Sequence, residues 1–437
     1  MVKLFEGAGV LRRGLHQGPE RGSVLRSVLA TTLIRLASIF LSFVASLVMA
    51  RVLGVADYGI YSYVMAIAAL LGVAVALGFP QYLVREASAR PEWVLGLWRW
   101  ADRGVMLAGV GGAALMLLLA WREDSARRGM ALALAAVIPM LTALSEVRRG
   151  LLQASGLVVR SQAALLLIAP LFMLTGVCWL WQVGSVVDVW QVMLLGVAAC
   201  AVSLVVTSVL LRRSVRGTEP VDIGDSRVLK VATSIRFMWL GALYMLLSRT
   251  DLIMLGLLSN DEDAGVYAVA SRAADLVPLL LMAANIVMAP RIASLYRDGE
   301  LSRLQEFLTS MMRVVVLCSL PLALFLFIGA NWLLRFFYGD AYLDGVPVLR
   351  LLVVAQFVLV LGGPLGTMLE MTGNEKSSLA VMTWVVLLNV VSNAVLIPPL
   401  GASGAAFATC ISVVLGRLLL LRKVRALLSV RVTALGF

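Results

Sequence analysis

The sequence predicts an all-α polytopic membrane protein with about twelve transmembrane helices in two bundles of six. Hydrophobic residues make up 61% of the chain, whereas a typical soluble domain is about half apolar. These residues lie in long runs, and about 20 apolar residues cross the hydrocarbon core of a bilayer as a helix. A short motif also recurs half a chain apart, which indicates two related halves.

The repeated motif lies in the connector 50–61, between the first two apolar runs. Gly54 and Gly59 break the helical pattern there and predict a tight turn at one membrane face. Residues 59–61 read Gly-Ile-Tyr, and residues 265–267 read Gly-Val-Tyr, at an offset of 206 in a chain of 437. This spacing is close to half the chain, as expected for an internal duplication.

Apolar periodicity predicts twelve helices. Their ranges are 28–50, 59–79, 104–120, 130–150, 162–181, 189–211, 231–257, 265–289, 308–329, 345–371, 378–397 and 402–421. Pro139 is expected to kink the fourth helix, and Gly-Gly-Pro-Leu-Gly at 362–366 to break or bend the tenth. A broken span is costly in lipid unless it faces protein or a water-filled cavity. The break in the tenth helix therefore indicates either that it faces a cavity or that it only relieves a steric clash in the packing of the helices.

The distribution of basic residues predicts the topology. With the N-terminus in the cytoplasm, 26 Lys and Arg side chains fall on the cytoplasmic side and 5 on the other side. Cytoplasmic loops of membrane proteins are enriched in Lys and Arg. We therefore expect a multi-pass protein of the cell inner (cytoplasmic) membrane with both termini in the cytoplasm.

The first apolar run is too long for a signal peptide and lacks a small-residue cleavage site, so we expect it to be retained.

The longest polar gap in the middle of the chain separates six spans from six. The predicted organisation is an N-terminal cytoplasmic segment 1–26, a first lobe 27–211, a cytoplasmic linker 212–230, a second lobe 231–421 and a basic cytoplasmic tail 422–437.

Several function classes lack a signature in this sequence. The four cysteines all lie in apolar runs without metal or disulfide spacing, and the single His16 lies in a polar segment. No hydrolase, kinase or phosphate-binding glycine motif is present, and the short outer connectors leave no domain for catalytic machinery. We therefore expect no cofactor, no metal and no enzyme activity. The net charge of +12 fits basic loops and an anionic ligand, and we expect no nucleic-acid partner.

Ionisable side chains within spans are costly in lipid and are functional candidates by default. Arg35 lies about a third of the way along the first helix, on a polar stripe with Thr31, Ser38, Ser42 and Ser46. Such a stripe indicates either a helix face toward a hydrated cavity or an arginine that snorkels to cytoplasmic headgroups.

A second group of charges lies in the seventh and eighth helices. Arg249 and Asp251 are two residues apart and do not share a helix face, so at least one needs a partner on another helix. Arg272 and Asp275 do share a face. A network of all four side chains is expected, either as a neutralised staple between helices or as a cationic site whose acids titrate or bind an ion.

Four further polar side chains are expected to have structural roles and not to bind a substrate. Glu146 and Glu370 lie near the predicted cytoplasmic ends of their spans and are expected to be interfacial groups. Asn389 and Asn393 share a face of the eleventh helix, where asparagine commonly hydrogen-bonds a neighbouring helix.

Several segments resemble one known family across nearly the whole chain. They are Ala-Arg-Val-Leu-Gly at 50–54, Asp-Tyr-Gly-Ile-Tyr at 57–61, Leu-Val-Arg-Glu-Ala at 83–87, Asp251, Gly-Val-Tyr at 265–267, Ala270, Phe-Tyr-Gly at 337–339, Asn-Ala-Val-Leu-Ile-Pro at 393–398 and Gly-Ala-Ser-Gly-Ala-Ala at 401–406. Together they resemble the polysaccharide transporters of the multidrug/oligosaccharidyl-lipid/polysaccharide (MOP) exporter superfamily, in the O-antigen and lipid-linked-oligosaccharide flippase branch.

This resemblance implies two six-helix bundles around a central cavity, alternating access, and export of a polyprenyl-diphosphate-linked glycan for surface polysaccharide biosynthesis. Arg35, Arg249 and Arg272 are then the expected substrate-binding residues, because arginine pairs bidentately with phosphate. Asp251 and Asp275 are the expected ion-coupling residues, for H⁺ or Na⁺. The lipid tail would stay in the membrane between the lobes. A monomer that contacts glycan-assembly proteins is the expected state.

Two alternatives remain open at this point. An ion-coupled multidrug exporter of the same superfamily would share the fold, but it would favour an acid-rich cavity for cationic drugs. A membrane glycan polymerase, ligase or glycosyltransferase would need a sizeable outer loop or an acidic pair near a membrane face. The positive balance of the deep charges argues against the first alternative. The short outer connectors and the repeat argue against the second.

Overall fold

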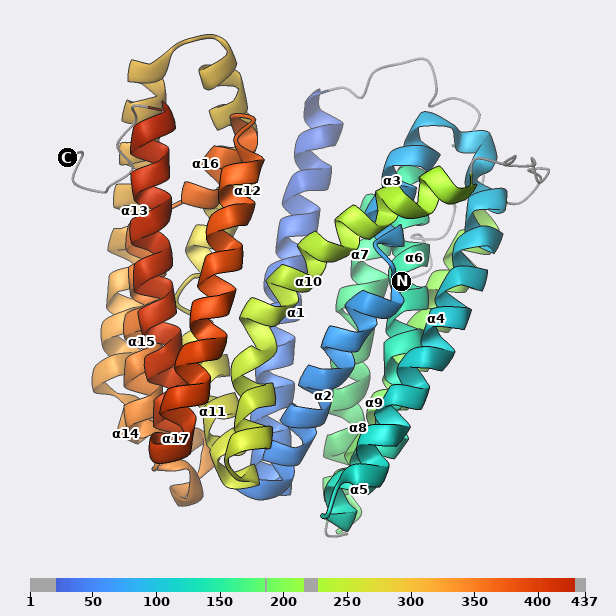
Figure 1. Ribbon diagram of the computed structural model, residues 1–437, viewed down its shortest axis with the longest axis vertical. Coiled ribbons are helices and arrows are strands. Elements are labelled where there is room, and N and C mark those ends of the chain that lie inside the picture. Colours follow the sequence, from blue (N-terminus) through green and yellow to red (C-terminus); the bar gives the residue numbers. More distant parts are fainter. Residues whose placement is uncertain (1–20, 185–186, 216–226, 429–437) are drawn as a thin grey trace.

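The computed structural model describes residues 21–184, 187–215 and 227–428, and this described part is helical and without β-strands. Figure 1 shows the helices gathered into two bodies, which meet near the lower end of the view and separate toward the upper end. The all-helical fold class predicted from the sequence is confirmed.

In the first half of the chain, the described residues form nine α-helices. They are α1 (Arg21–Leu53), α2 (Val55–Val75), α3 (Phe79–Ala89), α4 (Val94–Arg122), α5 (Ala126–Ala135), α6 (Ile138–Ala154), α7 (Val158–Leu166), α8 (Ile168–Gln182) and α9 (Val189–Ser214). The second half forms α10 (Arg227–Leu258), α11 (Asp261–Ala274), α12 (Leu279–Arg297), α13 (Leu301–Ile328), α14 (Ala330–Leu333), α15 (Gly345–Gly362), α16 (Leu365–Met371) and α17 (Glu375–Leu428).

The predicted number of about twelve spans is confirmed. In the described part, 11 helical stretches are long and apolar enough to cross a membrane. The last stretch, α17, contains Gly401 with a non-helical backbone (φ 55°, ψ −132°). A side chain at Gly404 would overlap the carbonyl of Leu396, so the chain folds back at this point. The two halves of α17 correspond to the predicted spans 378–397 and 402–421.

Four predicted spans are interrupted helices. The fifth divides into α7 and α8 at Leu167. The fourth divides into α5 and α6 just before Pro139, and the tenth divides into α15 and α16 at Gly363, whose φ is 70°. Both breaks were expected from proline and glycine. The prediction of a continuous eighth helix over 265–289 is wrong, because α11 ends at Ala274 and α12 begins after Pro278. Proline lacks the backbone N–H that would continue the helix.

Some predicted segment boundaries differ from the helix ends. Helix α1 already begins inside the predicted N-terminal segment 1–26, and α17 runs beyond 421 to Leu428. Residues 1–20 of that segment, 216–226 of the predicted linker and 429–437 of the predicted tail lie outside the described residues.

The two halves pack against each other through the repeated motif. A side chain at Gly59 in α2 would overlap the backbone carbonyl of Asp261, and one at Gly265 in α11 would overlap the carbonyl of Val55. Both pairs, Gly59 with Gly265 and Val55 with Asp261, are related by the same offset of 206 residues. The equivalent motifs therefore face each other in a symmetric contact, which only glycine permits at this separation.

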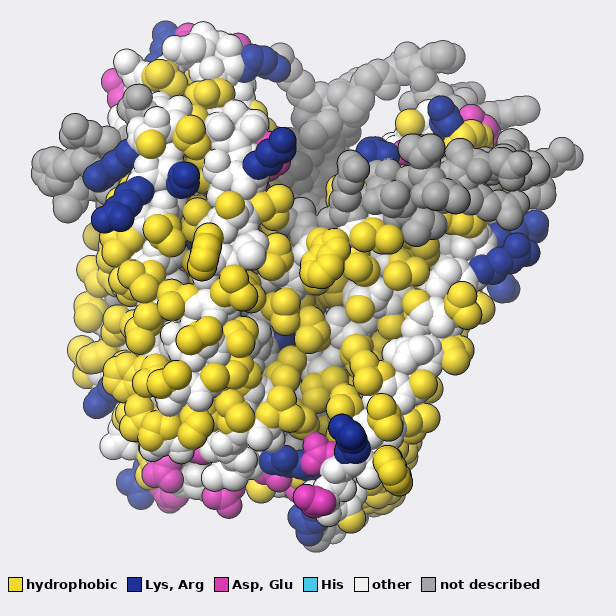
Figure 2. All heavy atoms as spheres, in the orientation of Figure 1, with side chains coloured by type: hydrophobic (Ala, Val, Ile, Leu, Met, Phe, Trp, Pro, Cys, Tyr) yellow, Lys and Arg dark blue, Asp and Glu magenta, His cyan; other side chains and the backbone are white. Residues whose placement is uncertain are grey.

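Charged residues reinforce this contact. The Nε of Arg128 in α5 donates to Oδ1 of Asp261 in α11 at 2.6 Å, and one terminal nitrogen of Arg128 donates to the carbonyl of Gly256 at 3.0 Å. Arg128 and Asp261 belong to connectors that the charge distribution predicts to lie on the non-cytoplasmic side of the membrane. Figure 2 shows an apolar belt across both bodies, with charged side chains above and below it. This pattern fits a protein embedded in a bilayer.

Candidate functional site

A cavity of about 880 Å³ lies between the two halves of the chain. The first half contributes uncharged side chains, among them Ser42 and Ser46 of α1 and Tyr58 and Tyr61 of α2. All the Lys, Arg, Asp and Glu side chains that line the cavity in the described part belong to the second half. They are Arg249, Asp251, Arg272, Asp275, Glu370 and Arg417.

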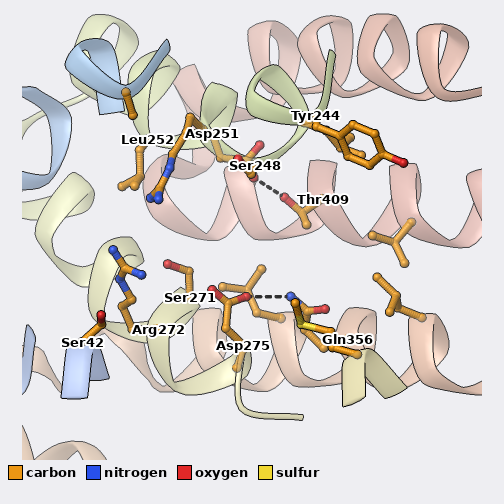
Figure 3. Close-up of a pocket in the computed structure, with 18 of the residues that line it drawn as sticks. Ser42, Tyr244, Ser248, Asp251, Leu252, Ser271, Arg272, Asp275, Gln356 and Thr409 are labelled. Atoms are coloured by element: carbon orange, nitrogen blue, oxygen red, sulfur yellow. Dashed lines mark hydrogen bonds between the residues drawn. The ribbon is translucent and has the colours of Figure 1, made fainter. Parts of the chain in front are cut away.

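Asp251 of α10 is buried and accepts hydrogen bonds from four neutral side chains. One of them, Thr409, is labelled in Figure 3. The Oδ1 of Asp251 accepts from the side-chain amides of Asn389 at 3.1 Å and Asn393 at 2.7 Å. Its Oδ2 accepts from the hydroxyls of Tyr267 at 2.6 Å and Thr409 at 2.7 Å. The described part of the chain places no cation within ion-pair distance of this carboxylate. The Oδ1 of Asn393 is also buried and has no hydrogen-bond partner.

Arg249 and Arg272 provide positive charge in the same cavity. The Nε of Arg249 is buried without a hydrogen-bond partner, and none of the ion pairs among the described residues includes either arginine. The two guanidinium groups are close enough to repel each other, and the carboxylate of Asp275 is close enough to attract both of them. Asp275 is exposed to the cavity, where it accepts a hydrogen bond of 3.0 Å from Gln356 (Figure 3).

The break in the tenth span also lines the cavity. Gly363 and Pro364 lie at this break, and one terminal nitrogen of Arg417 in α17 donates to the carbonyl of Gly363 at 3.2 Å. Glu370 of α16 accepts a hydrogen bond of 3.3 Å from the hydroxyl of Tyr244. Of the two interpretations of the glycine-rich break, the structure thus supports the one in which it faces a cavity.

A family model for a polysaccharide biosynthesis protein matches residues 48–347, which is more than half of the chain. The chain belongs to this polysaccharide biosynthesis protein family. No curated protein sequence matches it. Membership of the polysaccharide biosynthesis family, together with a cavity between two helical halves, indicates a transporter or flippase.

Solved structures of MOP superfamily members share the fold of this family member. The inward-facing form of a multidrug resistance MATE family transporter matches with a TM-score of 0.73 and 15% identity, over 90% of this chain and 98% of that chain. The lipid II flippase MurJ, in an inward closed conformation, matches with a TM-score of 0.73 and 13% identity, over 91% and 87%. A MOP superfamily transporter from Pyrococcus furiosus, whose binding pocket is described as having reverse polarity, matches with a TM-score of 0.63 and 16% identity, over 97% and 98%. The predicted resemblance to MOP transporters is thereby confirmed at the level of the fold.

The structure brings four of the five predicted site residues of this family member into one cavity: Arg249, Asp251, Arg272 and Asp275. They do not form the expected ion-paired network. Asp251 and Arg249 lie on different faces of α10, so Asp251 meets the neutral donors of α11 and α17. Arg35 is exposed and is not among the residues that line the cavity. Ser42 and Ser46 of the same polar stripe do line it.

Sequence reasoning missed other cavity residues. Arg417 is one of the 26 basic residues that the charge distribution assigns to the cytoplasmic side, in one group with Arg422, Lys423, Arg425 and Arg431. Glu370 was expected to be interfacial, yet it lines the cavity.

The prediction for Asn389 and Asn393 is confirmed. Both were expected to bond a neighbouring helix, and both donate to Asp251 of α10. Their spacing of four residues was the available signal.

Proposed function

We propose that this protein is a flippase that exports a polyprenyl-diphosphate-linked oligosaccharide across the cytoplasmic membrane by alternating access, for surface polysaccharide biosynthesis. Membership of the polysaccharide biosynthesis family supports a glycan substrate. The cavity supports a large polar headgroup. We also propose that the protein lies in the inner membrane with both termini in the cytoplasm, and that the linker 212–230 divides six spans from six.

The observation that carries the proposal is the pair of cavity arginines, Arg249 and Arg272, neither of which has a carboxylate within ion-pair distance in the described part of the chain. A cation inside a membrane protein is costly, and Arg249 and Arg272 are half-buried in the cavity wall, so both are well placed to bind an anionic ligand. A diphosphate presents several oxygens that guanidinium groups bind bidentately. Binding would also remove the repulsion between the two arginines.

A second pocket supports a lipid-linked form of the substrate. This space of about 320 Å³ lies between α1 and the break that separates α11 from α12, and Ser42, Arg272, Asp275 and Met282 line both it and the main cavity. Its other walls include Ile39, Phe43 and Leu279. A diphosphate at Arg272 could therefore extend its apolar tail between these helices toward the bilayer.

The coupling ion would act at Asp251, with Asp275 as the second candidate. Asp251 is a buried carboxylate surrounded by oxygen-bearing side chains, and the partnerless Oδ1 of Asn393 lies on a residue that contacts it. Hard cations such as Na⁺ bind oxygen ligands of this kind, and the carboxylate could alternatively accept a proton. A monomer that contacts glycan-assembly proteins completes the proposal.

Arg249→Gln and Arg272→Gln are expected to stop glycan export. In a strain deleted for this gene, we expect completed lipid-linked oligosaccharide units to accumulate on the inner leaflet while surface glycan disappears. The wild-type gene should restore surface glycan. Each glutamine variant should reduce export at least about tenfold, because a charge-assisted hydrogen bond contributes about 1.5–3 kcal/mol. Mass spectrometry of lipid extracts and quantified surface glycan measure both effects.

Arg303→Gln provides the matched control, since Arg303 is exposed and pairs with Glu300 outside the cavity. It should restore full export. Full export by both cavity variants would contradict the arginine site. Unchanged surface glycan without a lipid-linked intermediate in the deletion strain would contradict the flippase itself. Translocated but unpolymerised units would indicate a glycan polymerase.

A further inference from the structure

The two halves bind each other at equivalent points of their first helices. The hydroxyl of Tyr342, in the connector between α14 and α15, donates to the backbone carbonyl of Ala50 in α1 at 2.9 Å. One terminal nitrogen of Arg128 in α5 donates to the backbone carbonyl of Gly256 in α10 at 3.0 Å. Ala50 and Gly256 are 206 residues apart, which is the offset of the repeated motif. Each half therefore binds the same backbone position of the other half.

The contact made by Arg128 is charged. Its Nε also pairs with Asp261 at 2.6 Å, and its Cζ lies 5.7 Å from the centre of the Tyr63 ring. A side chain at Gly256 would overlap that ring, so glycine at this position lets α2 and α10 approach each other. The side chains of Arg128 and Asp261 are only 15% and 25% exposed. One arginine of the first half thus binds both sides of the turn between α10 and α11.

The contact made by Tyr342 is neutral, and both Tyr342 and Ala50 are buried. The carbonyl of Ala50 also accepts from the backbone N–H of Gly54 at 3.1 Å, so the bond from Tyr342 is additional to the helix. The ring of Tyr338 lies 5.8 Å from that of Tyr342, and its buried hydroxyl has no partner among the described residues. A buried hydroxyl without a partner is unfavourable, and exposure to water would remove this cost. The hydrogen bonds between the halves offset it in the conformation described here.

We infer that Arg128 and Tyr342 are two latches of a gate at the extracytoplasmic end, and that both must release before the cavity opens to that side. This inference rests on the proposed function, because it uses the proposed topology and alternating access. Figure 1 shows that the two bodies meet near the lower end, where α5 and the turn between α10 and α11 lie. Separation of the bodies at this end breaks both bonds. Because one latch is charged and the other is neutral, each can be removed by a substitution of its own.

The reactivity of a cysteine in the cavity measures how often this gate opens. Ser248 is exposed in the cavity wall, so Ser248→Cys provides the target in a chain whose four native cysteines are replaced. The reagent is a maleimide with a short, uncharged polyethylene glycol chain, which does not cross the membrane. In right-side-out vesicles it reaches the cysteine only through the extracytoplasmic end, and in inside-out vesicles only through the cytoplasmic end. When the gate opens and closes faster than the reagent reacts, the outside rate is proportional to the outward-open population.

Arg128→Gln should raise the outside rate about tenfold, because a hydrogen bond from a charged donor is lost. Tyr342→Phe should raise it about threefold, because a neutral hydrogen bond is lost. The variant with both substitutions should multiply the two effects. Asp261→Asn should add nothing to Arg128→Gln, since these two side chains belong to one latch. Arg127→Gln is the matched control and should keep the parent rate, because Arg127 pairs with Asp57 of its own half.

The inside rate should not rise in any of these variants. A rise of both rates would show that the substitutions only loosen the fold. An outside rate equal to that of the parent in the variant with both substitutions would show that these bonds hold no gate. Either result overturns the inference. The labelling needs no substrate, so both results are independent of whether the protein moves a glycan, which the lipid extracts of the deletion strain test.

Discussion

Asp251→Asn is expected to uncouple the transporter while leaving it folded. The asparagine keeps the shape of the side chain but removes the negative charge that a coupling cation or proton requires. Coupling free energies between two sites are typically about 1–3 kcal/mol, so we expect a loss of about 5-fold to 150-fold in driven export. The measurement is export into proteoliposomes at a series of Na⁺ concentrations and pH values.

In Asp251→Asn, the rate of export should not change with the Na⁺ concentration or with pH. Asp298→Asn is a suitable control, because Asp298 is exposed and its carboxylate pairs with Arg297 away from the cavity. Asp275→Asn shows whether the second predicted carboxylate shares the role. Asp251→Ala should also lose stability, since it would leave the donors of Asn389, Asn393, Tyr267 and Thr409 without their acceptor. An Asp251→Asn variant with wild-type ion dependence would refute the coupling site.

Gly265→Leu is expected to block export by holding apart the ends of the two halves. Any side chain at this position overlaps the backbone carbonyl of Val55, and a backbone group cannot rotate away. Overpacking of this kind typically costs about 1–3 kcal/mol. We expect α2 and α11 to separate at this contact, so that the protein no longer reaches the conformation described here.

Distance measurements between spin labels test this expectation. Labels at Asp124 and Glu262, both exposed, report on the two sides of the contact once the four native cysteines are replaced. The variant should show a longer distance than the parent protein. Gly111→Leu serves as the control, because a side chain at Gly111 meets open space. An unchanged distance together with normal export would show that the contact tolerates a side chain.

The fold could be predicted from the sequence largely because hydrophobicity alone determines membrane spans. The repeat at 59–61 and 265–267 indicated two halves, but it could not show that its copies pack against each other. The break at 275–278 was missed since Pro278 was placed inside an apolar run, where neighbouring helices often accommodate proline. Gly363 was easier to predict, because three glycines and a proline lie within five residues.

The candidate site was only partly predictable, because periodicity gives the face of a helix and not its neighbour. Asp251 was identified as costly in lipid, yet three of its four hydrogen-bond partners lie more than 130 residues away, at Asn389, Asn393 and Thr409. Arg417 resembled an ordinary cytoplasmic arginine until the structure placed it in the cavity wall. The depth of Arg35 in its span also did not predict whether its side chain faces the cavity. Arg35 is exposed and does not line the cavity.

The most direct test of the central claim is a flipping assay with purified protein in liposomes. A fluorescent polyprenyl-diphosphate oligosaccharide would be placed in one leaflet, and its appearance in the other leaflet would be followed by a membrane-impermeant quencher. We predict rapid transfer with the wild-type protein, transfer near the protein-free rate with Arg249→Gln and Arg272→Gln, and full activity with Arg303→Gln. A wild-type rate no higher than that of protein-free liposomes would contradict the claim that this cavity moves a lipid-linked glycan.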